Sequence, residues 1–332
     1  MKRTPIIIAS AVAILLMASC TKDGDCTSCP DADQQTEQSR EQGTLRVSMA
    51  FPEDAQTKAI TAYTTVQPYE KAVNKIQLLV FDNAGRLNAY RNLGTSTTAS
   101  ITTTTGTKKI WAVINGPDLS SVATESTLKS KTVSLASNST SASTGFVMAG
   151  YTSCALTTSG TSASISVSRL TARIALTSVS NNLPSVYPTL TVKKVYAVNV
   201  VGSQNLAGTM GASPSLNMGS DKGDAATLLS KTISQPVSRG GSYTPSTPNL
   251  FYAYSNGSST KTRLVVEAEV SGQTYYYPVT ISSLERNKAY TVAVNILNLG
   301  SDSPDKPVEK GSVNVTVSVA GWQSGANYDE SI

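Results

Sequence analysis

The sequence contains no histidine among its 332 residues. This absence excludes histidine-based acid–base catalysis and metal sites with histidine ligands. The G-x-S-x-G motif, the P-loop and the dinucleotide fingerprint are also missing from the sequence. Glu267 and Glu269 lie two positions apart in a predicted strand, a spacing that is typical of a solvated strand face. We therefore expect no catalytic residues, no metal site and no cofactor.

Charged and aromatic residues are few, at 15% and 6% of the sequence, whereas serine and threonine are abundant. This composition favours many short strands with polar outer faces over long surface helices. The formal charge of +5 is small and scattered along the chain, so it does not indicate a nucleic-acid partner. A chain of this length accommodates two β domains of ordinary size. The composition thus predicts an all-β protein.

Cysteines are also scarce, with four in the sequence. Cys26 and Cys29 form a single C-x-x-C pair, whereas zinc sites generally need two such pairs or additional histidines. A local disulfide and two free thiols are therefore the alternatives for this pair. Cys154 is the only cysteine beyond Cys29, and we predict that it is a small buried apolar residue.

No apolar run of the sequence is long enough to be predicted as a membrane span. The segment Ile6–Ala18 follows two basic residues and has the shape of a secretory signal. The small residues before Cys20 resemble the lipobox of bacterial lipoproteins, although Met17 stands where leucine is commonest. We expect residues 1–19 to be a signal peptide and Cys20 to carry acyl chains such as palmitate, which together anchor a protein stably. The alternative is an ordinary signal peptide with an incidental cysteine.

A polar tether and an alternating strand follow this segment. Lys22–Gln42 is almost free of apolar residues, so it cannot bury enough surface to offset the entropy of ordering. Polar residues then alternate with Leu45, Val47, Met49 and Phe51. Pro52 ends this strand, and an acidic loop, predicted to be susceptible to proteolysis, leads to Lys58-Ala59. The segment is either a strand that cleavage removes or the ordinary first strand of a β domain.

The rest of the chain consists of short apolar or alternating segments separated by turn residues, a pattern typical of β-sandwiches. Asp118 is predicted to cap a short helix that continues to Lys129. Gly202–Gly241 is rich in glycine and serine and has no assigned role, and Gly300–Gly311 is predicted to be a hinge or linker. We predict strands at residues 74–82, 100–105, 108–114, 145–150, 162–167, 168–179, 190–201, 249–254, 262–270, 273–281 and 288–298.

The last predicted strand, residues 312–320, has the cleanest alternation in the sequence. Its apolar face consists of Val313, Val315, Val317 and Val319. This valine ladder matches the apolar ladder of the first strand in length and spacing. A sandwich that loses its first strand has unpaired edges, and such edges invite another strand. The last strand of a neighbouring copy could fill this groove by β-augmentation.

Four segments of the sequence resemble the fimbrillins of Bacteroidales, the FimA-type subunits of type V pili. They are the lipobox at Cys20, KIQLLVFDNAGRL at Lys75–Leu87, SRLTARIAL at Ser168–Leu176, and the block YYYPVTISSLERNKAYTVAVNI at Tyr275–Ile296, which VNVTVSVAGW follows at Val313–Trp322. The resemblance spans most of the chain, and the C-terminal block is its most specific part. It implies two transthyretin-like β-sandwich domains, which we place at residues 59–167 and 168–332, with a removable N-terminal strand and a C-terminal donor strand.

The resemblance also implies a route of assembly. The chain is expected to pass through the periplasm as a lipoprotein and to reach the outer-membrane surface, where a trypsin-like protease cuts it. The cut is placed at Lys58-Ala59, which removes residues 20–58 with the lipid. Arg46 is the rival site, because the best-known relatives are cut after arginine. The implied product is a structural subunit of a fimbrium that supports adhesion and biofilm formation, with other copies of itself and accessory or anchor subunits as partners.

A tip adhesin or an anchor subunit that binds a host glycan or protein is the alternative function. The run Tyr275–Tyr277 could line a platform for a glycan, but ordinary strand packing also accounts for these three rings. A tip adhesin is expected to carry a dissimilar binding domain, and none is evident in the sequence. An anchor subunit is expected to keep its lipid and to resist cleavage.

Overall fold

The computed structural model describes most of the chain beyond the predicted tether. Residues Arg40–Ile332 form one compact unit. Cys20, Cys26, Cys29, Lys58 and Ala59 lie outside the described residues, so the predictions on them are not tested by the structure. The described ranges are 41–51, 67–138, 145–208, 215–216, 229–247, 249–256, 261–308, 312–321 and 328–331, and only the backbone is described at 215–216, 320–321 and 328–331.

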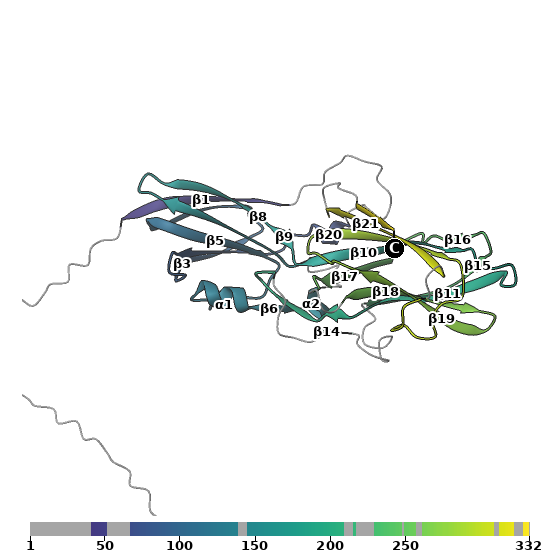
Figure 1. Cartoon of the computed structure of the whole chain (residues 1–332). Helices are drawn as coiled ribbons and strands as arrows, with labels where there is room; N and C mark the ends of the chain where they lie inside the picture. Colours follow the sequence, from purple (N-terminus) through teal and green to yellow (C-terminus); the bar gives the residue numbers. More distant parts are fainter. Residues whose placement is uncertain are drawn as a thin grey trace, which may run out of the picture. The chain divides into compact units, whose positions relative to one another are not determined.

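Most strands between residues 42 and 169 form two sheets that share a core. One sheet has three strands in the order β4-β1-β8, and the other has five in the order β3-β2-β5-β7-β9. Figure 1 shows β1, in purple, beside β8. The strands are β1 (Gln42–Ala50), β2 (Ile76–Asp82), β3 (Leu87–Gly94), β4 (Thr98–Thr104), β5 (Gly106–Ile114), β7 (Met148–Leu156), β8 (Thr161–Ser166) and β9 (Ser168–Arg169).

The strands from residue 171 onward form two larger sheets. A six-stranded sheet has the order β16-β10-β20-β21-β22, with β17 also paired to β10, and a four-stranded sheet has the order β15-β11-β18-β19. The strands are β10 (Thr171–Asn181), β11 (Thr189–Val198), β15 (Ser230–Ser238), β16 (Ser242–Tyr243), β17 (Asn249–Tyr254), β18 (Thr262–Val270), β19 (Gln273–Ile281), β20 (Lys288–Ile296), β21 (Val313–Gly321) and β22 (Tyr328–Ser331).

Short elements complete the described structure. Two small sheets pair β12 with β14 and β13 with β6. The helical elements are a 3-10 turn, η1, and two short α-helices. Their bounds are β6 (Thr132–Ser134), β12 (Val200–Val201), β13 (Ser203–Asn205), β14 (Ser215–Leu216), η1 (Pro68–Glu70), α1 (Glu125–Ser130) and α2 (Leu135–Asn138). The predicted all-β fold of packed sheets is confirmed.

The pattern of apolar residues explains which strands lie deepest. In β2, six consecutive residues from Ile76 to Phe81 are buried, because one face meets the three-stranded sheet and the other meets the core beneath α1. A strand covered on both faces is apolar at nearly every position rather than at alternate ones, and the one polar residue here, Gln77, is hydrogen-bonded to the backbone of Pro117 and Leu119. The prediction of a central strand here is confirmed.

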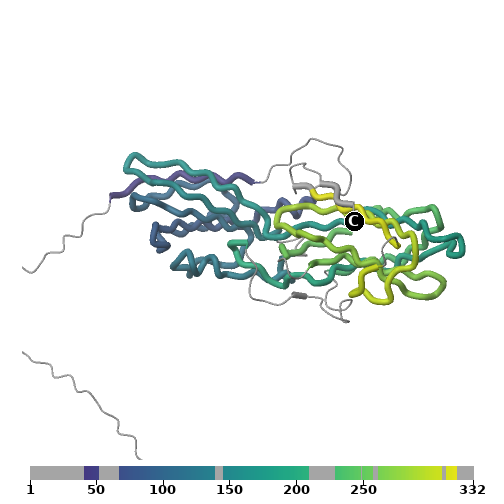
Figure 2. The backbone as a smooth tube through the Cα atoms, viewed as in Figure 1, coloured from purple at the N-terminus to yellow at the C-terminus, as the bar shows by residue number. Residues whose placement is uncertain are grey.

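One nearly continuous extended segment connects the two groups of sheets. β9 pairs with β7 of the first group, Leu170 interrupts the pairing, and β10 pairs with β17 and β20 of the second group. Figure 2 lets the reader follow this passage along the backbone. The predicted crossing at 168–179 is therefore confirmed, whereas the division of the chain into two domains at residue 168 stays a prediction.

Local side-chain chemistry shortened the predicted helix at 118–129. Asp118 does not cap it, because its carboxylate accepts hydrogen bonds from the backbone N and the hydroxyl of Ser120. The α-helix begins only at Glu125, and its N-cap is Thr124, whose hydroxyl accepts from the backbone N of Thr127. Asp and Ser favour such local turns over helix interiors, so the prediction was wrong by about two turns.

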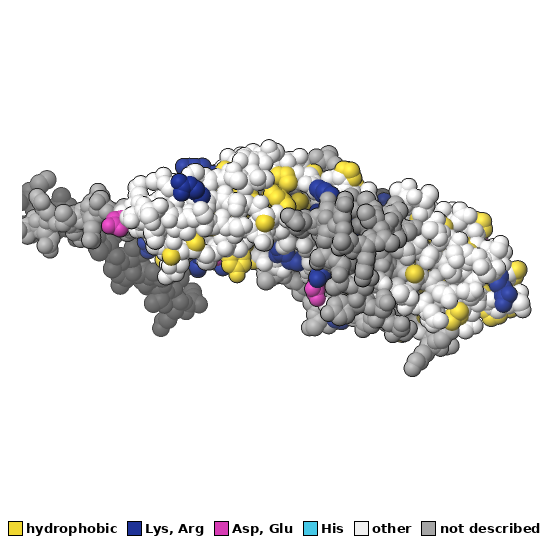
Figure 3. Space-filling model, turned by 90° about the horizontal axis from the view of Figure 1, so that it is seen from above, with side chains coloured by type: hydrophobic (Ala, Val, Ile, Leu, Met, Phe, Trp, Pro, Cys, Tyr) yellow, Lys and Arg dark blue, Asp and Glu magenta, His cyan; other side chains and the backbone are white. Residues whose placement is uncertain are grey.

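The part of the chain that the structure describes contains no helix long and apolar enough to cross a bilayer. On the face shown in Figure 3, hydrophobic side chains form only small separate patches, and lysine and arginine are more prominent than aspartate and glutamate.

Candidate functional site

The first strand, β1, is the central strand of its sheet rather than an edge strand. It pairs antiparallel with β4, from Gln42 opposite Thr104 to Ser48 opposite Thr98. On its other side it pairs parallel with β8, from Leu45 opposite Thr161 to Ala50 opposite Ser166. Within the described residues, β4 and β8 have no other strand partner. Removal of β1 would therefore leave two facing strand edges with unpaired N–H and C=O groups.

The apolar ladder of β1 points into the core between the two sheets. Leu45 is 0% exposed, Val47 3% and Met49 8%, and Phe51 packs partly buried against the same cluster. Arg46 and Ser48 point to solvent, as the alternation predicts. The ladder therefore contributes a large part of this core, and its loss would open an apolar groove.

The groove is lined by residues from both sheets. Ile101 of β4 lies opposite Leu45, and Ile165 of β8 lies opposite Met49. Leu78 and Ile110 of the five-stranded sheet belong to the same buried cluster. The sequence predicts strands in these places but does not place them in the groove. The alternation within each strand was visible, whereas the pairing of these strands with β1 was not.

The valine ladder of β21 lies in the other group of sheets. β21 pairs antiparallel with β20 along its whole length, from Val313 opposite Ile296 to Gly321 opposite Lys288. Val317 is buried, and the other three valines pack partly buried against the large core. The strand begins one residue later than predicted. The structure therefore does not bring the two ladders together within one chain, and each is docked in its own sheet.

The segment before β21 is more tightly held than its composition indicated. Residues 298–308, called the strap below, cross the edge strand β19, where Ser301 and Tyr276 exchange two backbone hydrogen bonds of 2.9 Å. Arg263 of β18 donates to the backbone O of Asp305 at 2.8 Å and to its carboxylate at 2.9 Å. The predicted hinge or linker is docked at these residues, because Arg263 and Tyr276 supply partners that the sequence pattern does not reveal.

Arg46, the rival cleavage site, lies in the middle of β1. Its side chain is exposed, but its backbone position is paired with Ser100 on one side and with Ser162 on the other. A protease needs its substrate extended and unpaired across several residues. Cleavage at Arg46 would therefore require the sheet to open first.

The three consecutive tyrosines do not form a continuous platform. Tyr277 is 0% exposed, and its hydroxyl donates to the backbone O of Asn298 at 3.2 Å. Tyr275 packs against the large core, whereas Tyr276 packs against a different cluster around Tyr196. Alternation thus sends neighbouring rings to opposite faces, so strand packing accounts for the run.

Two further predictions concern single chemical groups. Cys154 is half-buried and packs against the core that β1 completes, and burial raises the pKa of its thiol. This agrees with an apolar packing role. Among the described residues, no group of three or more cysteine, aspartate and glutamate side chains is arranged to hold a metal ion.

Comparisons with known proteins agree with this architecture. A family model described as "Major fimbrial subunit protein (FimA)" matches residues 44–212. No curated protein sequence matches the chain.

Solved structures share the fold at low sequence identity. A fimbrilin (FimA) from Porphyromonas gingivalis W83 aligns with a TM-score of 0.61 at 14% identity, over 86% of this chain and 98% of that one. A candidate cell adhesion protein from Bacteroides eggerthii aligns with a TM-score of 0.62 at 21% identity, over 85% and 96%. A second candidate cell adhesion protein, from Parabacteroides distasonis, gives 0.62 at 18% identity, over 87% and 99%.

Proposed function

The chain belongs to the FimA family of major fimbrial subunit proteins, and from this premise we propose that it is a structural pilin that polymerises by donor-strand exchange. As a fimbrial subunit, it has other fimbrial subunits as partners. In our proposal it reaches the cell surface as a lipoprotein attached through Cys20. Cleavage after Lys58 then removes the lipid and β1 together. The valine ladder of another copy fills the groove that β1 leaves.

The observation that supports this proposal best is the position of β1 between β4 and β8. A first strand at the edge of a sheet could leave without opening a groove. A central strand cannot, because its loss exposes two strand edges and an apolar core at the same time. A strand from another chain that carries four apolar residues at alternate positions restores both the hydrogen bonds and the burial.

The proposal also specifies the register of the incoming strand. A Cβ on Gly43 would lie 2.0 Å from the backbone O of Thr157, so only glycine fits at this position of β1. Gly311 stands two residues before Val313, as Gly43 stands two residues before Leu45. Aligned on these glycines, GTLRVSMAF and GSVNVTVSV carry their apolar ladders at the same positions. The donor strand would then enter in the orientation of β1, parallel to β8.

Replacement of Gly311 by valine is expected to abolish fibre formation, because the new side chain would meet the backbone of Thr157 in the acceptor groove. Electron microscopy and sedimentation of the processed protein measure the loss. Asn314→Val adds bulk on the exposed polar face of β21 and is expected to form normal fibres. Normal fibres from Gly311→Val would show that the register is wrong.

Replacement of Arg263 by alanine is expected to speed polymerisation of the processed protein. β21 must leave β20 before it can be donated, and the strap holds the chain just before β21. Loss of strap contacts worth about 1–2 kcal/mol would shift the equilibrium for release of the strap by roughly 5–30-fold. The effect should lie at the lower end of this range, because Asp305 is partly exposed to solvent.

Light scattering over time measures this effect. Lys306→Ala is the control, because it removes an ion pair with Asp302 inside the strap and leaves the contact with β18 intact. Equal rates for Arg263→Ala and the control would show that the strap does not limit release of β21.

The N-terminus of the surface protein tests the proposed function directly. Mass spectrometry of protein shed from cells is expected to find a chain that begins at Ala59. A chain that begins at an acylated Cys20 would instead identify an anchor subunit or a simple surface lipoprotein. A chain that begins at Val47 would show that the rival site, Arg46, is used.

A further inference from the structure

A second basic residue, Lys71, follows the proposed cleavage site at Lys58. A protease that cuts after basic residues should continue beyond Lys58 wherever it meets another accessible lysine. The next basic residue in the sequence is Lys71. Its side chain is exposed, and it directly follows the 3-10 turn η1. Accessibility of the side chain therefore does not explain how a single cut could be maintained.

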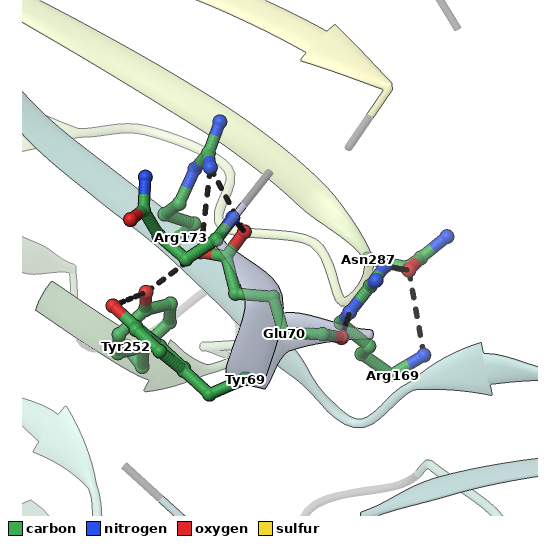
Figure 4. A network of polar contacts seen from close by, with 7 residues as sticks. Tyr69, Glu70, Arg169, Arg173, Tyr252 and Asn287 are labelled. Carbon is green, nitrogen blue, oxygen red and sulfur yellow. Dashed lines mark hydrogen bonds and ion pairs between the residues drawn. The ribbon is translucent and has the colours of Figure 1, made fainter. Parts of the chain in front are cut away.

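The backbone before Lys71 is held by a buried polar cluster, which consists of Glu70, Arg169, Arg173, Tyr252 and Asn287 and is called the Glu70 cluster below (Figure 4). The Glu70 carboxylate is 3.1 Å from the guanidinium of Arg173 and accepts a hydrogen bond of 2.6 Å from the Tyr252 hydroxyl. Arg169 donates from Nε to the backbone O of Glu70 at 2.8 Å, and its NH1 donates to Oδ1 of Asn287. Glu70 is 0% exposed, and both arginines are 1% exposed.

Contacts on either side extend this hold over neighbouring residues. The hydroxyls of Tyr69 and Tyr252 are 2.9 Å apart, and the Tyr69 ring packs against Phe146. The backbone N of Lys71 donates to the O of Pro68 at 3.2 Å. The backbone O of Ala72 accepts from the side-chain amide of Asn115 at 2.7 Å. The bond that follows Lys71 thus lies between two anchored residues.

We infer that the Glu70 cluster determines where processing stops, because it prevents the Lys71–Ala72 bond from entering a protease. Proteases bind several substrate residues in an extended form, which they pair with like an added strand. Residues 68–72 can adopt that form only if Glu70 leaves its buried site and Tyr69 leaves its partly buried one. This opening would strand the Arg173 guanidinium without the carboxylate that lies against it, which is strongly unfavourable. The inference rests on the proposed cleavage after a basic residue.

The same cluster also holds the first residues that the structure describes after Phe51. Gln67 is the first described residue after β1 and Phe51, and its backbone N donates to the Glu70 carboxylate at 2.8 Å. Departure of β1 can therefore leave the turn at residues 67–70 in place against β9, β10 and β17, because none of its contacts described above involves β1. Residues after Lys71 keep their connection to β2, so the five-stranded sheet that lines the acceptor groove stays in place.

Limited trypsin digestion of the full chain tests this inference. The protein is purified in detergent from a host that lacks the processing protease, and N-terminal sequencing and intact mass identify the largest product. Glu70→Leu removes the carboxylate but keeps similar bulk, and Arg173→Met removes its partner. Glu125→Leu is the matched control, since it deletes another buried carboxylate, which binds Lys109, Lys129 and Trp111.

The wild type and the control are expected to give a product that begins at Ala59, with Lys71 intact. Both cluster variants are expected to be cut at Lys71–Ala72 at least about ten-fold faster, because an unpaired buried charge favours local opening. Lys109 lies within β5, where its backbone is paired with β2 on one side and with β7 on the other. Its cleavage therefore reports global unfolding and should not occur in any variant. If a variant is also cut at Lys109, its digestion is repeated below its unfolding temperature. The initial rate of cleavage at Lys71–Ala72 is then compared with that of the wild type.

Two results would overturn different statements. If the wild type is cut at Lys71, or the cluster variants resist at Lys71 as the wild type does, the inference is wrong while the proposed function stands. If no wild-type product begins at Ala59, the proposed cleavage site is wrong. The same digests still test the inference, because they compare the rate of cleavage at Lys71–Ala72 between the wild type and the cluster variants.

Discussion

Deletion of residues 312–332 is expected to give a protein that is processed but forms no fibres. Of the strands described within residues 312–332, only β21 has an apolar pattern that matches the ladder of β1. Its four side chains would contribute roughly 6–12 kcal/mol of burial, at about 1.5–3 kcal/mol each, before the costs of association are subtracted. Without this strand, a copy can receive a donor but cannot supply one.

The truncated protein should therefore also terminate wild-type fibres. Added at low ratio to processed wild-type protein, it is expected to shorten the fibres seen by electron microscopy, because it occupies a growing end. Fibres made by the truncated protein alone would show that β21 is not the donor strand.

Point variants keep this test valid if the truncation destabilises the fold. Val317→Asp places a carboxylate on the apolar face, whereas Thr316→Asp places the same group on the exposed polar face. Burial of an unpaired charge costs several kcal/mol, so only Val317→Asp should prevent assembly. Circular dichroism confirms that both variants are folded before fibres are counted. Equal assembly by the two variants would contradict the donor role of the valine ladder.

Replacement of Lys58 by glutamine is expected to keep the protein on the membrane and to prevent assembly. Uncut, β1 stays covalently connected to its groove, and such a tether gives an effective concentration that a donor strand from another copy cannot match. The lipid predicted at Cys20 also stays attached. Cell fractionation and mass spectrometry of the surface protein measure both effects.

Arg46→Gln is the matched control for this variant. It removes the other basic residue of the segment, but from an exposed position on a strand paired on both sides. Processing of Arg46→Gln should therefore be normal. The reverse result, a normal product from Lys58→Gln and none from Arg46→Gln, would move the cleavage site into β1.

Several elements could be predicted closely because their pattern is local. Alternation and turn residues gave the observed bounds of β17, β18 and β19, and the apolar ladder of β1 points inward as expected. The sequence pattern does not reveal β15, because SKTISQPVS is polar at most positions, or β3, because LNAYRNLG has no regular alternation of apolar and polar residues. β3 and β15 lie at sheet edges. A strand there is more exposed to solvent than a central strand, so it needs fewer apolar residues.

The sequence by itself determined the two apolar ladders, the resemblance to a lipobox before Cys20 and the basic residues that a protease could use, because each of these depends on neighbouring residues alone. Tertiary structure alone decided that β1 is central, that the strap is docked, and that Glu70 is buried. The carboxylate of Glu70 meets Arg173 and Tyr252, which are 103 and 182 residues away in the chain. No local pattern carries information about such partners, because distant strands must pair before these side chains meet.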